Sequence, residues 1–310
     1  MNNVHGRVAT LKGILQNCVL CPRRCRVDRT RGETGFCRLG AAAVIDCALA
    51  HHGEEPPLSG AGGAGTIFFS SCNLKCVYCQ NYQISHNIRG KSLDKASLAE
   101  IMLALQADGC QNIEPVTPTP QTPQIMEALL QARERGLKVP FVYNCGGYEA
   151  PEVIRMLAGM VDIYLPDFKY GKEDEGLLFS GAQNYPSYAL ASIKEMIRQV
   201  GDELELEGNI AKKGILIRHL VLPGSLANSF AVLRMIREKL STRIPLSIMA
   251  QYSPIPAIWK DPVLGRRINH AEYEAVINFA LDMDFETIFT QEVDDHSLLP
   301  DFENDAPFTW

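Results

Sequence analysis

From Thr66 onward, short apolar runs alternate with longer segments in which apolar residues recur every three or four positions. The short runs are typical of buried strands, and the longer segments are typical of amphipathic helices. The predicted strands are Thr66–Ser70, Asn112–Val116, Phe141–Asn144, Val161–Leu165, Ile215–Leu222, Leu246–Gln251 and Thr287–Thr290. The predicted helices are Lys95–Ala107, Pro123–Arg135, Pro151–Ala158, Tyr188–Val200, Ser229–Leu240 and Ala271–Asp282. This alternation predicts an α/β fold with a mostly parallel sheet.

Six to seven strands that alternate with helices fit a sheet that closes, or partly closes, into a barrel. We therefore predict a partial (β/α)6-type TIM-like barrel with a small Cys-rich module at its N-terminus. The loops that follow the strands of such a barrel converge on one mouth, where the catalytic residues lie. Residues directly after predicted strands are thus the first candidates for a functional site.

The chain divides into three regions by composition. Residues 1–60 form the N-terminal module, which is rich in Cys, Arg, Gly and Pro and has one predicted strand, Ala43–Leu49. Residues 61–293 form the core barrel, and residues 294–310 form an acidic tail without Lys or Arg. The tail either stays mobile or docks through its apolar residues. Those residues are Leu298, Leu299, Phe302, Phe308 and Trp310.

Composition narrows the classes of function. The 310 residues are 46% hydrophobic and 21% charged, which is enough apolar material for one barrel-sized globular domain. A net charge of −6 provides no basic field for nucleic acid. His5, Arg7 and Lys12 interrupt the N-terminal segment, so we expect neither a signal peptide nor a membrane span, and a cytoplasmic protein. In a reducing compartment the ten cysteines are expected to bind metal, not to form disulfides.

A Cys-x3-Cys-x2-Cys loop, formed by Cys72, Cys76 and Cys79, follows the first barrel strand directly. Iron–sulfur clusters usually take four thiolates, so three close cysteines leave one iron open to a ligand from outside the protein. The alternatives are a zinc knot or a ferredoxin-type cluster with a distant fourth cysteine. The candidates for that fourth ligand are Cys47, Cys110 and Cys145.

The segment Cys72-x3-Cys76-x-Tyr78-Cys79 resembles the signature of the radical S-adenosylmethionine (SAM) superfamily. The resemblance implies an oxygen-sensitive 4Fe–4S oxidoreductase that reductively cleaves S-adenosyl-L-methionine to a 5′-deoxyadenosyl radical for hydrogen abstraction. It places Tyr78 beside the adenine of the cofactor and makes the three cysteines both metal ligands and catalytic residues. It also implies a one-electron reductant such as flavodoxin or ferredoxin as a partner.

Further segments resemble the proteins related to pyruvate formate-lyase activating enzyme, including an uncharacterised branch of that group. They are Gly65–Phe69, Tyr143–Tyr148, Asp162–Tyr170, Ile217–Arg218 and Val221–Gly224. This resemblance implies a glycyl-radical-enzyme activase-like protein whose substrate is a protein glycine. A short peptide or a small molecule in a more closed pocket is the alternative substrate class.

The same resemblance implies the residues that bind the cofactor. Lys169 and Arg218 are expected near its carboxylate and ribose, because a cation suits a carboxylate. The alternative is that each forms an ion pair at the barrel mouth, for example with Asp167. Thr117, Asn144 and Asp167 are further candidates for cofactor contacts.

Two features depart from the activases. Val116–Pro120 stands where the family has Gly-Gly-Glu, so backbone carbonyls or the hydroxyls of Thr117 and Thr119 would have to accept from the cofactor's ammonium group. Gln251–Tyr252 replaces a family histidine.

Two other motifs are discounted. Gly60–Gly65 matches Gly-x-Gly-x-x-Gly but precedes a strand, whereas a dinucleotide-binding loop follows one. The segment His51-His52-Gly53-Glu54-Glu55 suggests a metal site. However, His51 and His52 are adjacent on an extended segment, so their side chains should point to opposite faces, on the surface or toward the substrate.

Cys18, Cys21, Cys25 and Cys37 supply four thiols within the N-terminal module. Four ligands suit a closed zinc site or an auxiliary iron–sulfur cluster, and a set of free, packed thiols is the alternative. Arginines lie among these cysteines. Their positive charge would lower the pKa of the thiols, which favours metal ligation, and would also suit an acidic protein partner. They are Arg23, Arg24, Arg26, Arg29, Arg31 and Arg38.

A second class of function stays open at this point. The chain can instead be a non-catalytic iron–sulfur or zinc protein for electron transfer or assembly. That class leaves the barrel-sized scaffold and the open iron position without a role.

Overall fold

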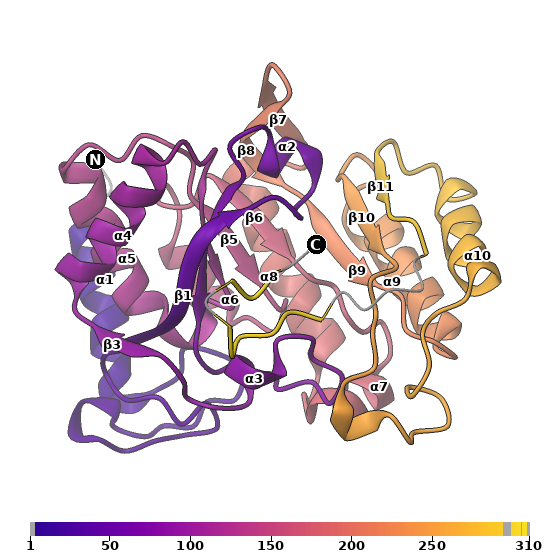
Figure 1. Cartoon of the computed structure of the whole chain (residues 1–310), viewed down its shortest axis with the longest axis horizontal. Helices are drawn as coiled ribbons and strands as arrows, with labels where there is room; N and C mark the ends of the chain where they lie inside the picture. The colour runs from indigo at the N-terminus through magenta and orange to yellow at the C-terminus, as the bar shows by residue number, and fades with distance from the viewer. Residues whose placement is uncertain (1–3, 294–298, 305, 309–310) are drawn as a thin grey trace.

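The computed structural model describes residues 4–293, 299–304 and 306–308. Its strands form an eight-stranded sheet in the order β3-β1-β2-β4-β5-β6-β8-β7 and a three-stranded sheet in the order β11-β10-β9 (Figure 1). The strands are β1 Ala43–His51, β2 Ala64–Phe69, β3 Lys91–Leu93, β4 Ile113–Val116, β5 Val142–Cys145, β6 Ile163–Pro166, β7 Leu204–Glu207, β8 Ile210–Ile215, β9 Ile217–Leu220, β10 Leu246–Met249 and β11 Ile288–Thr290.

The two sheets together form one curved wall whose central strands are parallel. Strands β2, β4, β5, β6 and β8 pair in parallel, as do β9, β10 and β11. A parallel bridge between Asp167 and Arg218 joins the end of β6 to β9, so the wall continues from the first sheet into the second. The predicted α/β fold with a partial parallel barrel is therefore confirmed, and the predicted strand Ile215–Leu222 divides at Leu216 into the end of β8 and β9.

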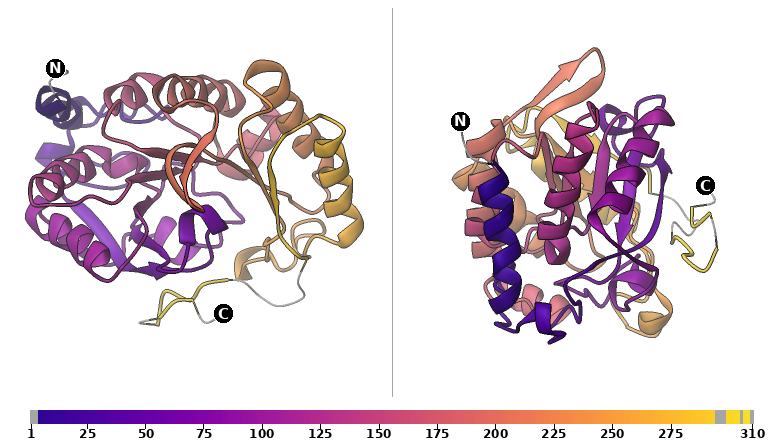
Figure 2. Two further views of the ribbon diagram at one scale, coloured as in Figure 1. Left: turned by 90° about the horizontal axis from the view of Figure 1, so that it is seen from above. Right: turned by 90° about the vertical axis from the view of Figure 1, so that its left-hand side faces the viewer.

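Helices cover the outer side of this wall, while the C-terminal segment runs along the opposite side (Figure 2). Asp94 caps the start of α4 by accepting from the backbone N–H of Ser97, and Asn269 and Glu272 form a capping box at α10. The α-helices are α1 Val4–Gly13, α2 Pro56–Ser59, α3 Tyr82–Ser85, α4 Lys95–Ala107, α5 Thr122–Glu134, α6 Pro151–Met156, α7 Glu173–Ser180, α8 Tyr185–Val200, α9 Leu226–Lys239 and α10 His270–Leu281. Short 3-10 turns lie at Ile14–Asn17, Arg29–Arg31, Thr119–Gln121 and Pro256–Ile258.

The N-terminal region is in contact with the barrel along much of its length. Helix α1 packs against α5 and α6 through the buried side chains of Val8 and Leu11. Strand β1 pairs antiparallel with β2, with His51 opposite Ala64. Because β1 runs against β2, the residues after His51 reach the barrel at the N-terminal ends of its strands. The predicted boundary near residue 60 therefore falls between two hydrogen-bonded strands, and the division into domains remains a prediction.

The described part of the C-terminal tail docks on the barrel. Phe302 is buried, and its ring centroid lies 5.4 Å from that of Phe68 on β2. Phe308 packs 5.2 Å from Phe68 and 4.5 Å from His51. We call residues 299–308 the C-terminal strap, of which 299–304 and 306–308 are described. Of the two predicted alternatives, a docked or a mobile tail, these residues show docking; Leu298 and Trp310 lie outside the described residues.

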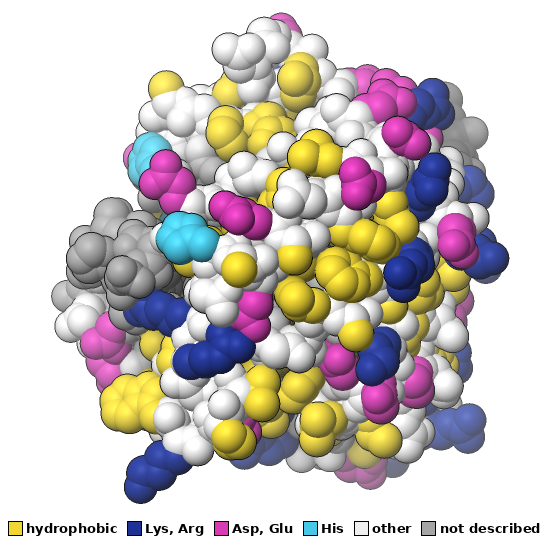
Figure 3. Space-filling view, turned by 90° about the vertical axis from the view of Figure 1, so that its right-hand side faces the viewer, with side chains coloured by type: hydrophobic (Ala, Val, Ile, Leu, Met, Phe, Trp, Pro, Cys, Tyr) yellow, Lys and Arg dark blue, Asp and Glu magenta, His cyan; other side chains and the backbone are white. Residues whose placement is uncertain are grey.

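Among the described residues no helix is long and apolar enough to cross a membrane. On the face over α9 and α10, acidic and basic side chains are interspersed among apolar ones (Figure 3). Neighbouring charges of opposite sign leave this face without an extended field of one sign.

Candidate active site

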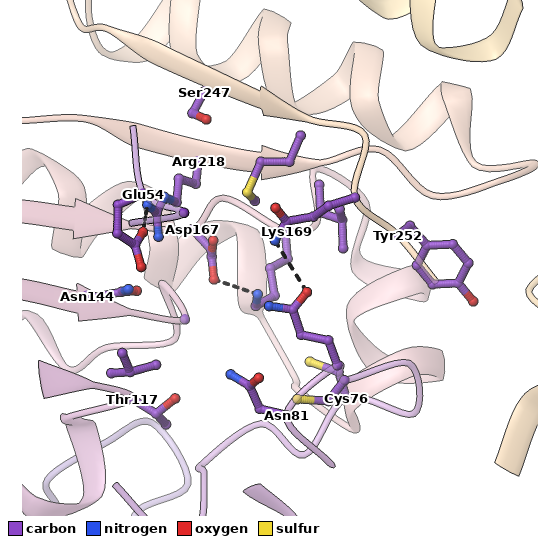
Figure 4. A pocket seen from close by; sticks show the side chains of 18 of the residues that line it. Glu54, Cys76, Asn81, Thr117, Asn144, Asp167, Lys169, Arg218, Ser247 and Tyr252 are labelled. Atoms are coloured by element: carbon purple, nitrogen blue, oxygen red, sulfur yellow. Dashed lines mark hydrogen bonds and ion pairs between the residues drawn. The ribbon is translucent and has the colours of Figure 1, made fainter. Parts of the chain in front are cut away.

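A cavity of about 490 Å³ lies inside the barrel and is lined by residues from both of its sheets. Figure 4 shows Cys76 and Asn81 at one end of the view and Glu54 and Arg218 at the other. The lining includes all nine residues predicted for the cluster and the cofactor: Cys72, Cys76, Tyr78, Cys79, Thr117, Asn144, Asp167, Lys169 and Arg218. The fold thus brings these nine residues, which lie between positions 72 and 218, to one cavity.

The loop that carries Cys72, Cys76 and Cys79, which we call the cluster loop, leaves the C-terminal end of β2 in a tight curl. Ser71 and Lys75 have φ of 67° and 51°, in the left-handed region that non-glycine residues rarely adopt. The backbone N–H of Leu74 donates to the Cys72 sulfur at 3.3 Å. This curl places the three cysteines along one side of the cavity.

Hydroxyl groups from two other elements reach the remaining sulfurs. Ser180, the last residue of α7, donates to the Cys76 sulfur at 2.9 Å, and Ser85 of α3 donates to the Cys79 sulfur at 3.2 Å. Hydrogen bonds of this kind tune the potential of a thiolate-bound cluster.

The thiols fit a metal cluster better than they fit bare thiolates. Burial, reinforced by the neighbouring Cys76, raises the pKa of Cys72 to about 12 and that of Cys79 to about 11. Thiolates at these positions therefore require a cation, and metal coordination deprotonates a thiol outright. Among the suggested fourth ligands, Cys145 also lines the cavity, whereas Cys110 lies in the hydrophobic core and Cys47 packs beside Phe68.

Tyr78 belongs to an aromatic wall beside the cluster loop. Its ring packs edge-on against Phe179 and Tyr252, with centroids 6.0 and 6.2 Å away. Its hydroxyl donates to the hydroxyl of Tyr170 at 2.8 Å. These contacts fix the ring at the wall of the cavity, which is consistent with a role as a stacking surface.

Lys169 and Asp167 form an ion pair at the end of β6, with Nζ 2.6 Å from Oδ2. Burial alone would lower the pKa of Lys169, but Asp167 and the nearby cysteines raise it above its ordinary value. The ammonium group therefore remains charged at the cavity wall. The predicted alternative of an ion pair with Asp167 is present, and its geometry is compatible with a cofactor contact by either side chain.

Arg218 is held by two carboxylates. Its Nε donates to Glu55 at 2.9 Å, and its Nη2 contacts both Glu54 and Glu55. Burial alone would lower the pKa of Arg218, and these carboxylates hold it well above its ordinary value. Its ion pair therefore differs from the predicted one with Asp167, and a contact between Arg218 and the cofactor stays a prediction.

Thr117 and Asn144 follow or end neighbouring strands. The Thr117 backbone, at φ of 58°, donates to the Asn144 carbonyl at 3.0 Å, and the Asn144 amide donates to Glu114 at 2.7 Å. The Thr119 hydroxyl instead donates to the buried Glu149 at 2.7 Å, so it is already engaged on the far side of this loop. Of the two threonines, Thr117 is the one that lines the cavity.

A glycine brings the loop after β5 close to the end of β6. A Cβ atom on Gly147, which has φ of 75°, would lie 2.1 Å from the carbonyl oxygen of Asp167. Only glycine fits this approach. The Gly146–Gly147 pair thus holds the loop that follows Asn144 against the Asp167–Lys169 segment.

Sequence reasoning missed several residues of the cavity. Glu54 and Glu55 line the cavity but were considered only as part of the discounted metal motif. His51 also lines the cavity and His52 is exposed, as expected for adjacent residues on an extended segment. Ser247 was passed over, yet the register places it beside Arg218. Glu114 is not among the residues that line the cavity, but it accepts from the cavity residue Asn144. It had a visible signal, because a carboxylate inside an otherwise buried strand requires a partner. Burial and the nearby charge of Glu54 raise the pKa of Glu114 well above its ordinary value.

The cysteines of the N-terminal module lie elsewhere. Cys18, Cys21, Cys25 and Cys37 line a separate cavity of about 20 Å³, together with Asn73 of the cluster loop.

The comparisons with known proteins agree with this geometry. The Radical SAM superfamily matches residues 66–206, which include the cluster loop. The uncharacterized protein MJ0674 of Methanocaldococcus jannaschii is 30% identical over 291 residues, covering 91% of this chain and 80% of the relative. This chain belongs to the radical SAM superfamily. It is therefore a radical SAM enzyme, which uses a 4Fe–4S cluster to cleave SAM.

Solved structures share the fold. Streptococcus suis SuiB bound to S-adenosylmethionine has a TM-score of 0.52 and 12% identity, covering 72% of this chain and 48% of SuiB. SuiB bound to its precursor peptide SuiA has a TM-score of 0.51 and 13% identity, covering 72% and 47%. The chain thus spans about half the length of SuiB. At this identity the likeness concerns the fold of the radical SAM domain alone.

Proposed function

We propose that Cys72, Cys76 and Cys79 bind a site-differentiated 4Fe–4S cluster and that Tyr78, Thr117, Asn144, Asp167 and Lys169 position SAM beside it. The observation that supports this most directly is the convergence of all these residues on one cavity. When bound, the reduced cluster supplies the electron that cleaves SAM and starts hydrogen abstraction.

Each side chain has a definite task in this proposal. Lys169 offers a buried ammonium donor to a carboxylate, and Asp167 holds that ammonium at 2.6 Å. The edge-packed ring of Tyr78 offers its face to an aromatic base. Arg218 forms ion pairs with Glu54 and Glu55, which keep its positive charge in one place at the polar end of the cavity. The C-terminal strap, through Phe308, excludes water from one side.

We further propose an activase-like role, in which the hydrogen is abstracted from a protein substrate. The support is the sequence resemblance to the activase-related proteins at Asp167–Lys169 and Ile217–Arg218, because the side chains of Asp167, Lys169 and Arg218 line the cavity. A small polar substrate is the second candidate, because the cavity extends past Lys169 to the charged groups of Glu54, Glu55 and Arg218. A one-electron donor such as flavodoxin or ferredoxin would serve either reaction.

Anaerobic reconstitution with iron and sulfide, followed by assay for 5′-deoxyadenosine, tests the core of the proposal. Alanine at Cys72, Cys76 or Cys79 should remove cluster absorbance and product formation together, because each thiolate anchors the cluster. Cys145→Ser is the matched control, since Cys145 lines the same cavity and should be dispensable. Loss of the cluster in Cys145→Ser would instead indicate a closed four-cysteine cluster and contradict the proposal.

The substrate class has its own test. Anaerobic extract of the source organism is separated by ultrafiltration, and each fraction is added to reconstituted enzyme with SAM and reductant. The activase-like role predicts that the retained protein fraction accelerates 5′-deoxyadenosine formation and acquires a glycyl radical signal in electron paramagnetic resonance. Acceleration by the filtrate alone would favour the small-molecule alternative.

A further inference from the structure

The four cysteines of the N-terminal module lie on a compact hairpin and the loop that returns to it. The backbone N–H of Cys18 donates to Val27 at 3.0 Å, and the N–H of Arg26 donates to Cys18 at 2.9 Å. A turn closes between them through a 3.0 Å bond from the N–H of Arg24 to the Cys21 carbonyl. Cys18, Cys21 and Cys25 are thus held on one short structural unit.

The returning loop brings the fourth cysteine to the same place. The backbone N–H of Phe36 donates to the Cys25 sulfur at 3.3 Å. A Cβ atom on Gly35 would lie 2.6 Å from that sulfur, so glycine is needed for the loop to approach. Cys37 follows, and all four cysteines line one cavity of about 20 Å³.

The small size of this cavity favours one of the two metal centres that four thiolates can bind. A volume near 20 Å³ accommodates about one water-sized atom. A cubane of four irons and four sulfides needs several times that space, whereas one Zn²⁺ takes four sulfurs in a tetrahedron. Among the described residues no three Cys, His, Asp or Glu side chains already have metal-binding geometry, either here or at the cluster loop. The thiols would therefore close on an ion by rotation about χ1.

We propose that Cys18, Cys21, Cys25 and Cys37 bind a single structural Zn²⁺, and that this zinc knot holds the cluster loop in place. The zinc site goes beyond the proposed function, and its effect on the loop rests on that function. Four protein ligands leave no open position, so the knot has no catalytic role.

Direct contacts join the knot to the cluster loop. The Ser71 hydroxyl donates to the Cys37 carbonyl at 2.6 Å, and Arg23 Nε donates to the Asn73 carbonyl at 2.9 Å. The same guanidinium donates to the Ser180 carbonyl at 2.7 Å, and the Ser180 hydroxyl bonds the Cys76 sulfur. Arg23 is therefore a positioning residue between the zinc knot and the cluster loop.

Metal analysis of full-length variants tests the site. In Cys72→Ala/Cys76→Ala/Cys79→Ala, which lacks the cluster ligands, we expect one zinc per chain and no acid-labile sulfide. Adding Cys18→Ser and Cys21→Ser should remove that zinc, whereas adding Cys47→Ser and Cys110→Ser, outside both cysteine sets, should not. Iron with labile sulfide in place of zinc, or equal metal content with and without Cys18 and Cys21, would overturn the proposal.

Cobalt substitution gives a readout that does not depend on the folding of the Cys18/Cys21 variant. Co²⁺ added to the metal-depleted cluster-ligand variant should produce the intense d–d and charge-transfer bands of tetrahedral cobalt thiolate, at one equivalent. Weak octahedral bands would contradict a four-thiolate site.

The link to the cluster loop is tested by Arg23→Met, with Arg31→Met as the control because the side chain of Arg31 is 84% exposed. Both variants should retain zinc. The electron paramagnetic resonance spectrum of the reduced cluster should change in Arg23→Met and remain that of wild type in Arg31→Met. Identical spectra in the two variants would overturn the positioning role while leaving the proposed zinc site and the proposed function standing.

Discussion

At the scale of single residues, His219 shows how burial sets a charge state. It lies next to Arg218 on β9, and its Nδ1 is 2.8 Å from the Phe168 carbonyl while its Nε2 is 2.8 Å from the Ser229 hydroxyl. The neutral tautomer with the proton on Nδ1 satisfies both partners. Burial lowers the pKa of His219 to about 4. A neutral imidazole thus fixes the backbone directly before Lys169.

This depressed pKa predicts a pH dependence of stability. The folded value is about 4, and an unfolded histidine titrates near 6.5. Between these values the unfolded chain binds more protons, so stability falls as pH decreases from about 6.5 to 4, by up to roughly 3 kcal/mol. His219→Gln retains a donor and an acceptor but does not titrate. Urea unfolding of the apoprotein at several pH values should show a flatter profile for this variant, and parallel profiles would refute the assignment.

Lys169 gives a second prediction at this scale. Lys169→Met keeps the length of the side chain but loses a charge-assisted contact of about 1.5–3 kcal/mol, so SAM affinity should fall by about 10- to 100-fold. The reconstituted cluster should absorb as in wild type before SAM is added. Titration of SAM into the reduced enzyme measures the affinity. Lys172→Met, on the same segment but 41% exposed, is the control, and equal affinities in the two variants would contradict a role for Lys169.

The site residues differ in how far sequence could predict them. Spacing alone predicted that Cys72, Cys76 and Cys79 face one cavity, because a short loop has few ways to present three thiols. The partners of Arg218 could not be predicted, since Glu54 and Glu55 are more than 160 residues away in the chain. Only the antiparallel course of β1 brings them to the barrel interior.

At the scale of elements, the C-terminal strap has a role that composition did not specify. Its Phe302 N–H donates to Gln83 at 2.8 Å, and the Gln83 amide donates to Asp301 at 2.9 Å. Gln83 belongs to α3, which directly follows the cluster loop. The strap therefore packs on the element that holds one wall of the active-site cavity.

Phe302→Ala should release the strap without unfolding the barrel. The buried ring makes its contacts with Phe68, Phe308 and their neighbours, so the loss should be local. Hydrogen exchange measured by mass spectrometry should rise in peptides covering the strap and α3, and stay unchanged in β5 and β6. Leu178→Ala is the control, because Leu178 in α7 is 70% exposed. Unchanged exchange in α3 would show that the strap does not support it.

Regular elements with strong local signals could be predicted from the sequence. Helix α4 has the predicted bounds because Asp94 caps its start, and both faces of β2 are apolar because both are buried. Helix α1 was missed because its apolar stripe is short: Val4, Val8 and Leu11 have helical spacing, but only Val8 and Leu11 are buried and the residues between them are mostly polar or small. Helix α7 was missed because its Leu177 and Leu178 are exposed and give no core-facing stripe.

At the scale of the whole molecule, one buried ion-pair cluster ties the segment after β1 to β9 across the interior of the partial barrel. Arg218 belongs to β9 in the three-stranded sheet, whereas Glu54 and Glu55 follow β1 near the edge of the eight-stranded sheet. Strands β1 and β9 do not pair with each other, so these side chains make the connection between them. The side chain of Arg218 is only 11% exposed, and those of Glu54 and Glu55 are 9% and 7% exposed.

Arg218→Met should therefore destabilise the fold strongly. Removing one member of a buried ion pair leaves uncompensated charge, and the expected loss in free energy of unfolding is about 3–5 kcal/mol at neutral pH. Glu54→Gln/Glu55→Gln/Arg218→Met should lose less than Arg218→Met alone, because no buried charge is left unpaired. Urea unfolding measures both. Arg243→Met, at a surface pair with Asp202 whose arginine is 54% exposed, should cost less than about 1 kcal/mol. If Arg218→Met kept wild-type stability but lost SAM binding, the arginine would serve the cofactor and the ion-pair cluster would not be what ties β9 to the segment after β1.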